Sequence, residues 1–125
     1  MTTLRVLPDL GAIPRADWDA LAPGRNPFVS HDFLAGLERH GCLRERVGWR
    51  PHHLGLWDGD TLVAAVPAYR KANSHGEFVF DHAWADAYER AGGKYYPKLL
   101  AAVPYSPVPG PRLLATDSTA RARIA

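Results

Sequence analysis

The sequence predicts one mixed α/β domain in which an antiparallel β meander is framed by helices. Its 125 residues suit a single domain with a core of its own. Apolar residues make up 46% and charged residues 22%, the balance of a folded globular protein. Segments with helical spacing of apolar residues lie on either side of Val-rich and Ala-rich segments bounded by turns. Eleven prolines and eleven glycines indicate short elements joined by shaped loops.

The first third of the chain predicts one strand and two helices. Residues 3–7 alternate in polarity and predict a short strand. Residues 14–21 predict a helix with Pro14 in its first turn. Residues 26–29 predict an extended lead-in to a second helix, which Ser30 caps and Gly41 ends. The side chains expected to be buried on these helices are Ile13, Trp18, Leu21, Phe33, Leu34 and Leu37.

The middle of the chain predicts the meander. Residues 53–57 and 61–69 read as two strands joined by a tight turn at residues 58–60, because Asp-Gly readily adopts the positive φ of hairpin turns. Pro67 implies a bulge or an edge position, since it has no amide to donate. Residues 77–80 predict the third strand.

Four further segments complete the predicted order β-α-α-β-β-β-α-β-α. They are a helix at residues 94–103, a stiff extended loop at 105–111, a strand at 112–115 and a last helix at 119–125. The last helix has about two turns and no completed apolar stripe, and isolated helices this short are marginal. The alternatives are a frayed C-terminus and truncation of a longer protein, and we expect residues 1–125 to be truncated.

Composition and charge argue against several classes of partner. The net charge is only +2 and the arginines are scattered, so no direct DNA binding is expected. No run approaches the ~20 apolar residues of a membrane span. The single cysteine, Cys42, and a start without a signal-peptide pattern predict a cytoplasmic protein.

Four motifs carry a resemblance to a known family. They are Asn26-Pro-Phe-Val-Ser-His-Asp-Phe-Leu34, Phe80-Asp-His-Ala-Trp-Ala-Asp-Ala-Tyr88, Tyr95-Tyr-Pro-Lys-Leu-Leu100 and Ser106-Pro-Val-Pro-Gly-Pro-Arg-Leu-Leu114. In this order they resemble the FemAB-like predicted N-acyltransferases, which are associated with peptidoglycan biosynthesis or recognition. The order of elements also resembles the first part of the GCN5-related N-acetyltransferase fold. The resemblance implies two acetyltransferase-like halves, of which residues 1–125 would be the N-terminal half-domain.

The resemblance implies transfer of an acyl or aminoacyl group to an amine, on a small molecule or a peptidoglycan precursor. Acyl-CoA or aminoacyl-tRNA would be the donor of the full-length protein. The missing C-terminal half or a partner chain would complete the enzyme, and this half is expected to be inactive alone. Two alternatives remain: a non-catalytic module that recognises cell-wall precursors or a protein partner, and an inactive truncated fragment.

Residues 81–88 form the densest functional-looking segment. Asp81, His82 and Asp86 are the candidate catalytic residues, because a carboxylate or imidazole can take a proton from an attacking amine. Trp84 and Tyr88 would line the acceptor pocket. In a strand or extended loop, successive side chains here would point to opposite faces. The alternative is that the aromatics pack and the charges lie on the surface.

The segment after it offers further substrate-binding candidates. Tyr95 and Tyr96 supply phenols that can act as acids, and Lys98 supplies an ammonium for a carboxylate or phosphate. Beside a proline, such aromatics also pack without a chemical role. A recognition module would use the aromatic residues as a stacking surface: Trp57, Trp84, Tyr88, Tyr95 and Tyr96.

A donor-phosphate loop is the candidate cofactor site. The acetyltransferase pattern Arg/Gln-x-x-Gly-x-Gly/Ala precedes a helix, and its amides hold phosphate. Arg90 and Gly93 fit this pattern and Lys94 would add charge, but Tyr95 stands where Gly or Ala is expected. The Gly92-Gly93 pair also reads as an ordinary turn before a helix.

No metal site and no nucleophilic enzyme are expected. His52, His53, His75 and His82 lack the spacing of zinc ligands. Cys42 follows a helix-ending glycine. A position at the start of a helix would lower the pKa of its thiol, but Cys42 is not at such a position.

Overall fold

The computed structural model describes residues 2–21, 26–43, 48–73, 81–105, 111–115 and 118–124. The fold is mixed α+β, as predicted, with four helices and seven strands in the described part. In chain order the elements are β1 (Thr2–Leu7), η1 (Leu10–Ala12), α1 (Arg15–Asp19), η2 (Pro27–Val29), α2 (His31–Arg39), β2 (Trp49–Pro51), β3 (His53–Asp58), β4 (Thr61–Val66), β5 (Tyr69–Lys71), α3 (His82–Arg90), β6 (Lys98–Leu100), β7 (Leu114–Ala115) and α4 (Ser118–Ile124). The expected order of elements differs from this one in the second half of the chain.

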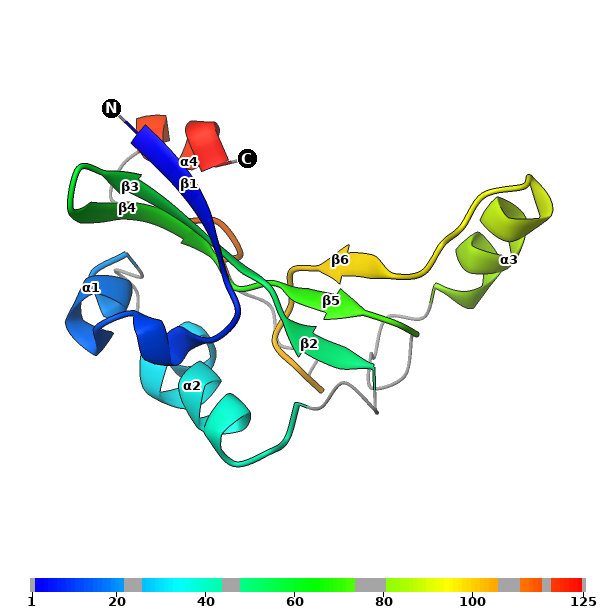
Figure 1. The fold of residues 1–125 in the computed structure, drawn as a ribbon, viewed down its shortest axis with the longest axis horizontal. Helices are drawn as coiled ribbons and strands as arrows, with labels where there is room; N and C mark the ends of the chain where they lie inside the picture. The colour runs from blue at the N-terminus through cyan, green and yellow to red at the C-terminus, as the bar shows by residue number, and fades with distance from the viewer. Residues whose placement is uncertain are drawn as a thin grey trace.

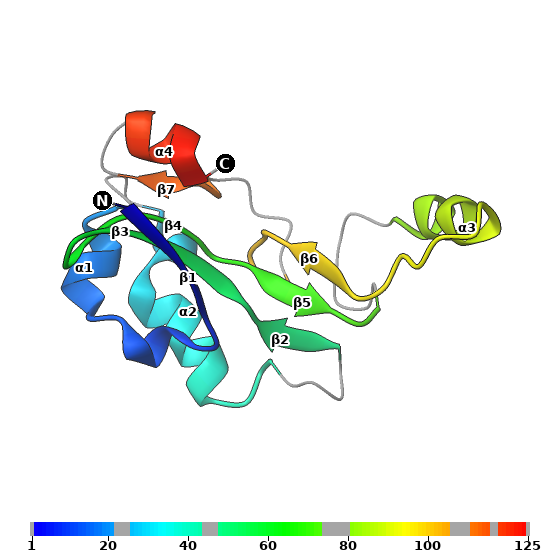
Figure 2. The ribbon, with the colours of Figure 1, turned by 45° about the horizontal axis from the view of Figure 1, so that its top comes forward.

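The strands form two antiparallel sheets rather than one meander. The first, the body sheet, has the order β1-β3-β4-β7, and the second, the arm sheet, has the order β2-β5-β6. Helices α1 and α2 lie on one face of the body sheet and α4 lies on the other (Figures 1 and 2). We call these helices and the body sheet the body, and the arm sheet with α3 the arm.

The body has a core on each face of its sheet. Trp18, Leu34, Leu62 and Ala65 are buried between the helices α1 and α2 and strand β4. The other core packs α4 against β3 and β4, and α4 contributes two of its buried side chains: Ala120 and Ile124. The last helix was expected to have no completed apolar stripe; that expectation is wrong, since these two residues lie one turn apart and face the sheet.

Several predicted elements are confirmed. These are the first strand, the first two helices, the strand and tight turn at residues 53–60, and the last strand and helix. The Ser30 cap is present, because the Phe33 amide donates to Ser30 Oγ at 3.3 Å. Gly59, in the turn, has a φ of 62°. The positive φ is the reason that this position takes glycine.

The strand expected at residues 61–69 is divided in two at Pro67. β4 ends at Val66 and β5 begins at Tyr69 in the other sheet. Pro67 has no amide, and the amide of Ala68 donates to His53 Nδ1 at 3.1 Å instead of to a neighbouring strand. The chain therefore leaves the body sheet at Pro67 and enters the arm sheet.

Three other expectations are wrong. The predicted extended lead-in at residues 26–29 is wrong beyond Asn26, because Pro27–Val29 form the 3-10 turn η2. The Asn26 side chain caps this turn by accepting a hydrogen bond from the Phe28 amide at 3.0 Å. The helix expected at residues 94–103 is replaced by strand β6. Strand β2 was not expected at all. The strand predicted at residues 77–80 and most of the loop at 105–111 lie outside the described residues.

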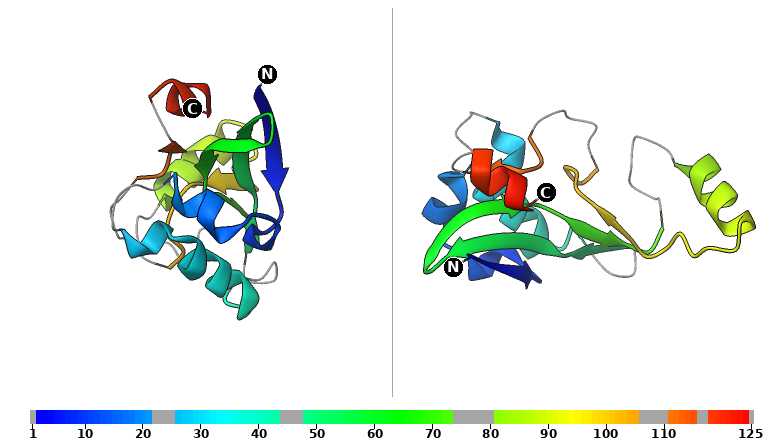
Figure 3. Two further views of the ribbon diagram at one scale, coloured as in Figure 1. Left: turned by 90° about the vertical axis from the view of Figure 1, so that its left-hand side faces the viewer. Right: turned by 90° about the horizontal axis from the view of Figure 1, so that it is seen from above.

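Helix α3 projects from the far end of the arm sheet, away from the other helices (Figures 1 and 3). Ala85 is its buried residue, whereas Trp84 is 75% exposed. In the part of the chain that the structure describes, no helix is long and apolar enough to cross a membrane.

Candidate functional site

The candidate site lies in the arm, where Asp81 precedes α3 and the chain returns from α3 to β6. Asp81 Oδ2 accepts hydrogen bonds from the Tyr95 hydroxyl, at 2.5 Å, and from the Lys98 ammonium. Lys98 and Asp81 also form an ion pair, with side chains only 14% and 19% exposed. We call these three residues the Asp81 cluster. It joins a carboxylate, a phenol and an ammonium at one oxygen atom.

The turn that ends α3 brings the cluster together. Gly92 has a φ of 94°, and the Gly93 amide donates to the Tyr88 carbonyl at 3.0 Å, which closes a glycine-based helix end. The Tyr88 ring lies against Gly93 so closely that a Cβ there would be 2.3 Å from a ring atom. The chain thus doubles back along α3, and Tyr95 meets Asp81, with the Tyr88 and Tyr95 rings 6.1 Å apart.

The electrostatics of the cluster assign distinct roles to its members. The hydrogen bond to Asp81 is the main cause that raises the pKa of Tyr95; desolvation and the Asp81 charge add to it, and the Lys98 charge opposes it. Tyr95 therefore stays protonated at neutral pH and donates its proton to Asp81. Lys98 Nζ also lies 5.5 Å and 5.8 Å from the ring centres of Tyr95 and Tyr96. Asp81 thus accepts a hydrogen bond from each of the other two members of the cluster.

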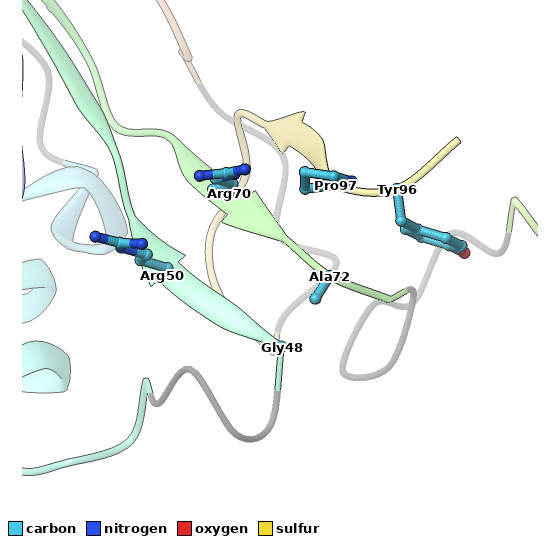
Figure 4. Close-up of a pocket in the computed structure, with 6 residues that line it drawn as sticks. All are labelled: Gly48, Arg50, Arg70, Ala72, Tyr96 and Pro97. Carbon is cyan, nitrogen blue, oxygen red and sulfur yellow. The ribbon is translucent and has the colours of Figure 1, made fainter. Parts of the chain in front are cut away.

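A pocket of about 370 Å³ lies on the face of the arm sheet that carries Arg50 and Arg70, opposite the face of Lys98. Its lining residues come from the arm strands and the segment before β6: Gly48, Arg50, Arg70, Ala72, Tyr96 and Pro97 (Figure 4). Tyr96 links the pocket to the cluster, since its ring centre is 5.0 Å from that of Tyr95. Arg50 of β2 stands directly opposite Arg70 of β5. The pocket is therefore cationic on one side and aromatic on the other.

The match to a protein-family model decides the family. The model of the FemAB-like family, described as peptidoglycan biosynthesis/recognition, matches residues 9–125. The chain belongs to the FemAB-like family. No curated protein and no solved structure matches it significantly. The family resemblance predicted from the four motifs is thus confirmed.

The other acceptor-site candidates of this FemAB-like chain lie along α3. His82 and Asp86 are exposed and, being four residues apart on a helix, share one face. The alternation expected for a strand is wrong here. Trp84 and Tyr88 are also one turn apart and lie on a different side of α3, where both are exposed. Of these four, Tyr88 reaches the cluster through Tyr95.

The candidate donor loop of the FemAB-like chain ends a helix rather than starting one. The amides of Gly92 and Gly93 donate to the carbonyls of Glu89 and Tyr88. Arg90 lies in the last turn of α3, where its Nε donates to the Asp86 carbonyl at 3.4 Å, and Lys94 is exposed just beyond. The end of a helix carries carbonyls and partial negative charge, so this turn lacks the amide cradle that holds phosphate.

Sequence reasoning does not identify Arg50 and Arg70 as site residues. Each lies in a strand of only three residues, and their juxtaposition depends on the register of β2 against β5. The one available signal is the pair of basic residues, Arg70 and Lys71, that follows a buried strand. Pairing between strands this short is not readable from local sequence.

The aromatic residues do not form one surface. Trp57 lies in β3 of the body, packs against the first core and is covered by Arg5, whose guanidinium is 5.1 Å from the ring centre. Tyr96 lines the arm pocket with the Tyr95 ring beside it, and Trp84 and Tyr88 lie on α3. Four of the five candidate stacking residues therefore belong to the arm.

His53 is a structural residue. It is fully buried, and its Nδ1 accepts the Ala68 amide, so the ring proton lies on Nε2 and is donated to Glu38 Oε1 at 2.8 Å. Glu38 Oε2 accepts the Leu10 amide at 3.0 Å. Both ring nitrogens are thus engaged. Within the described ranges, no group of three or more His, Cys, Asp or Glu side chains could hold a metal ion.

Proposed function

We propose that this FemAB-like chain supplies the acceptor side of an N-acyltransferase that acts on an amine of a peptidoglycan precursor. The observation that supports it is the Asp81 carboxylate, which Tyr95 and Lys98 hold in place. An amine attacks only after it loses its proton, and a fixed carboxylate is a suitable acceptor. In the proposed step the amine nitrogen bonds to the acyl carbon, the bond to the donor's leaving group breaks, and the amine proton passes to Asp81.

The donor is proposed to be acyl-CoA or aminoacyl-tRNA, used in the cytoplasm and bound by a second acetyltransferase-like half or a partner chain. The turn that contains Arg90, Gly93 and Lys94 has no set of free backbone amides that could bind phosphate, because the Gly92 and Gly93 amides donate within the helix end. This argues for a donor site elsewhere. Leu4 and Val6 of β1 are exposed large apolar side chains on the body sheet. Exposed apolar residues of this kind are suited to packing against a further half-domain.

The test is amide formation by the full-length protein. Purified protein is incubated with a muropeptide acceptor and a panel of acyl-CoA and aminoacyl-tRNA donors, and products are identified by mass spectrometry. Asp81→Asn keeps the shape but removes the proton acceptor, so we expect the rate to fall about 100-fold or more. Asp60→Asn, in the exposed β3–β4 turn, is the matched control and keeps full activity. Absence of transfer with every donor contradicts the proposal.

The second candidate function is recognition of a cell-wall precursor without catalysis. The observation that favours it is the exposure of Trp84 and Tyr88 on a helix that projects from the fold. Exposed aromatics four residues apart offer stacking area to a sugar or peptide. Trp84→Ala is then expected to weaken retention of the protein on immobilised muropeptide about tenfold or more, as for an aromatic hot spot. Val6→Ala, an exposed apolar change on the body, is the control; no retention at millimolar ligand contradicts this function.

A further inference from the structure

Two arginines face each other on the exposed side of the arm sheet. Arg50 and Arg70 are directly opposite in the antiparallel β2–β5 pair, and both side chains are exposed. Like charges at directly opposite positions destabilise a sheet. Among the described residues, neither guanidinium has a carboxylate or other hydrogen-bonding partner. Within the described part of the chain, the double positive charge of the pair is therefore not compensated by an ion pair.

The pocket beside the pair is shaped by small residues at one end and rings at the other. The Ala72 amide donates to the Gly48 carbonyl at 3.2 Å, which closes the end of the strand pair. Gly48 has a φ of 86°, and a Cβ there would be 2.5 Å from the Asn73 side chain, so the position requires glycine. Tyr96 and Pro97 form the opposite wall (Figure 4). The space of about 370 Å³ is suited to a small polar ligand.

We propose that Arg50 and Arg70 bind a phosphate or diphosphate group of a ligand that occupies this pocket. A phosphate ester carries nearly two negative charges at neutral pH, whereas a carboxylate carries one, so phosphate matches the pair. Guanidinium groups bind phosphate oxygens in bidentate fashion. The Tyr96 ring offers a face on which the sugar or base of the same ligand can stack.

The position of the anion has a consequence for the neighbouring cluster. Tyr96 lies in the pocket wall and its ring contacts that of Tyr95, which is bonded to Asp81. Lys98, the other partner of Asp81, pairs with Lys71 and so lies on the opposite face of the sheet from the arginines. A ligand at the arginines therefore adjoins the cluster through the Tyr96 ring, and the anion site does not rest on the proposed function.

The test is a calorimetric titration of the full-length protein with inorganic pyrophosphate, with acetate as the carboxylate control. We expect Arg50→Gln and Arg70→Gln each to weaken pyrophosphate binding about tenfold or more, and the double variant to lose it. Arg121→Gln, an exposed arginine of α4 in the body, is the matched control and binds as the wild type does. Circular dichroism melts accompany each titration. Because the double variant removes a repulsion, its melting temperature is expected to equal or exceed that of the wild type.

Two further titrations identify the source of the phosphate. Binding of UDP-N-acetylglucosamine more tightly than coenzyme A assigns the site to a nucleotide-linked acceptor, and the reverse order assigns it to the donor. The inference is overturned if pyrophosphate does not bind, if acetate binds as tightly, or if the double variant binds pyrophosphate as the wild type does. Failure of acyl transfer leaves these titrations unchanged, so the two proposals fail separately.

Discussion

At the scale of single residues, Tyr69 joins the body to the arm. It is fully buried at the start of β5, with its ring 5.2 Å from that of His53 and 5.3 Å from that of Trp49. Its hydroxyl has no hydrogen-bond partner in the described part of the chain. Burial, with a smaller contribution from the Glu38 charge, raises the pKa of Tyr69 far above its usual value. The phenol is therefore neutral in the folded protein at every ordinary pH.

Tyr69→Phe is expected to leave stability at neutral pH unchanged or to raise it by about 1 kcal/mol, because it removes a buried hydroxyl that bonds to nothing described. In the wild type, the unfolded chain loses the Tyr69 proton near pH ~10 while the folded chain keeps it. The contribution of Tyr69 to the free energy of unfolding is therefore constant below pH ~10 and decreases as the pH rises above this value. Tyr69→Phe should make that fall shallower in urea unfolding curves.

Tyr95 and Tyr105, whose pKa values are also raised, contribute to the part of the slope that remains. Trp84→Phe changes an exposed ring that does not ionise and is the control, with the wild-type slope expected. A loss of more than about 1 kcal/mol at neutral pH in Tyr69→Phe would show that the hydroxyl is bonded after all.

At the scale of elements, the sequence predicts the body well and the arm poorly. β1, α1, α2 and β3 have clear alternation, helical spacing, caps or a turn, and each packs against the body cores. The arm strands β2 and β6 have three residues each, and their pairing is fixed by contacts distant in sequence. α3 has helical spacing in Trp84, Ala85 and Tyr88, but most of this face is exposed, so no core contact marks the segment as a helix.

The candidate site follows the same division. Asp81, Tyr95 and Lys98 are recognisable as reactive residue types, but their convergence on one oxygen depends on the return of the chain after α3. The Gly92-Gly93 pair fits both a phosphate loop and a helix end, and only the three-dimensional course of the chain separates them. The Arg50–Arg70 pair depends entirely on strand register.

The turn after α3 gives a prediction for this element. In Gly93→Ala the new Cβ meets the Tyr88 ring at 2.3 Å, so the ring must move and the turn that brings Tyr95 to Asp81 loosens. We expect the amides of α3 to lose hydrogen-exchange protection about tenfold, while the melting temperature of the body changes little.

Gly36→Ala is the matched control. Gly36 lies within α2 and a Cβ there meets nothing within 4 Å, so alanine is expected to stabilise the protein by about 0.5–1 kcal/mol. Unchanged exchange rates in α3 of Gly93→Ala would contradict the role given to the Tyr88–Gly93 contact.

At the scale of the whole molecule, two antiparallel chain segments connect the sheets. One runs from β2 through His52 into β3, and the other runs from β4 through Pro67 and Ala68 into β5. Two hydrogen bonds join these segments. The His52 amide donates to the Ala68 carbonyl at 2.9 Å, and the Ala68 amide donates to His53 Nδ1. The body and the arm therefore share a crossover that is bonded at its centre.

A paired crossover resists torsion far more than a single strand of chain does. His53 at its centre is held in turn by Glu38 of α2, and Glu38 by the amide of Leu10. The orientation of the arm, with α3 and the Asp81 cluster, therefore depends on hydrogen bonds inside the body. A change at Glu38 or His53 would alter the angle between the body and the arm.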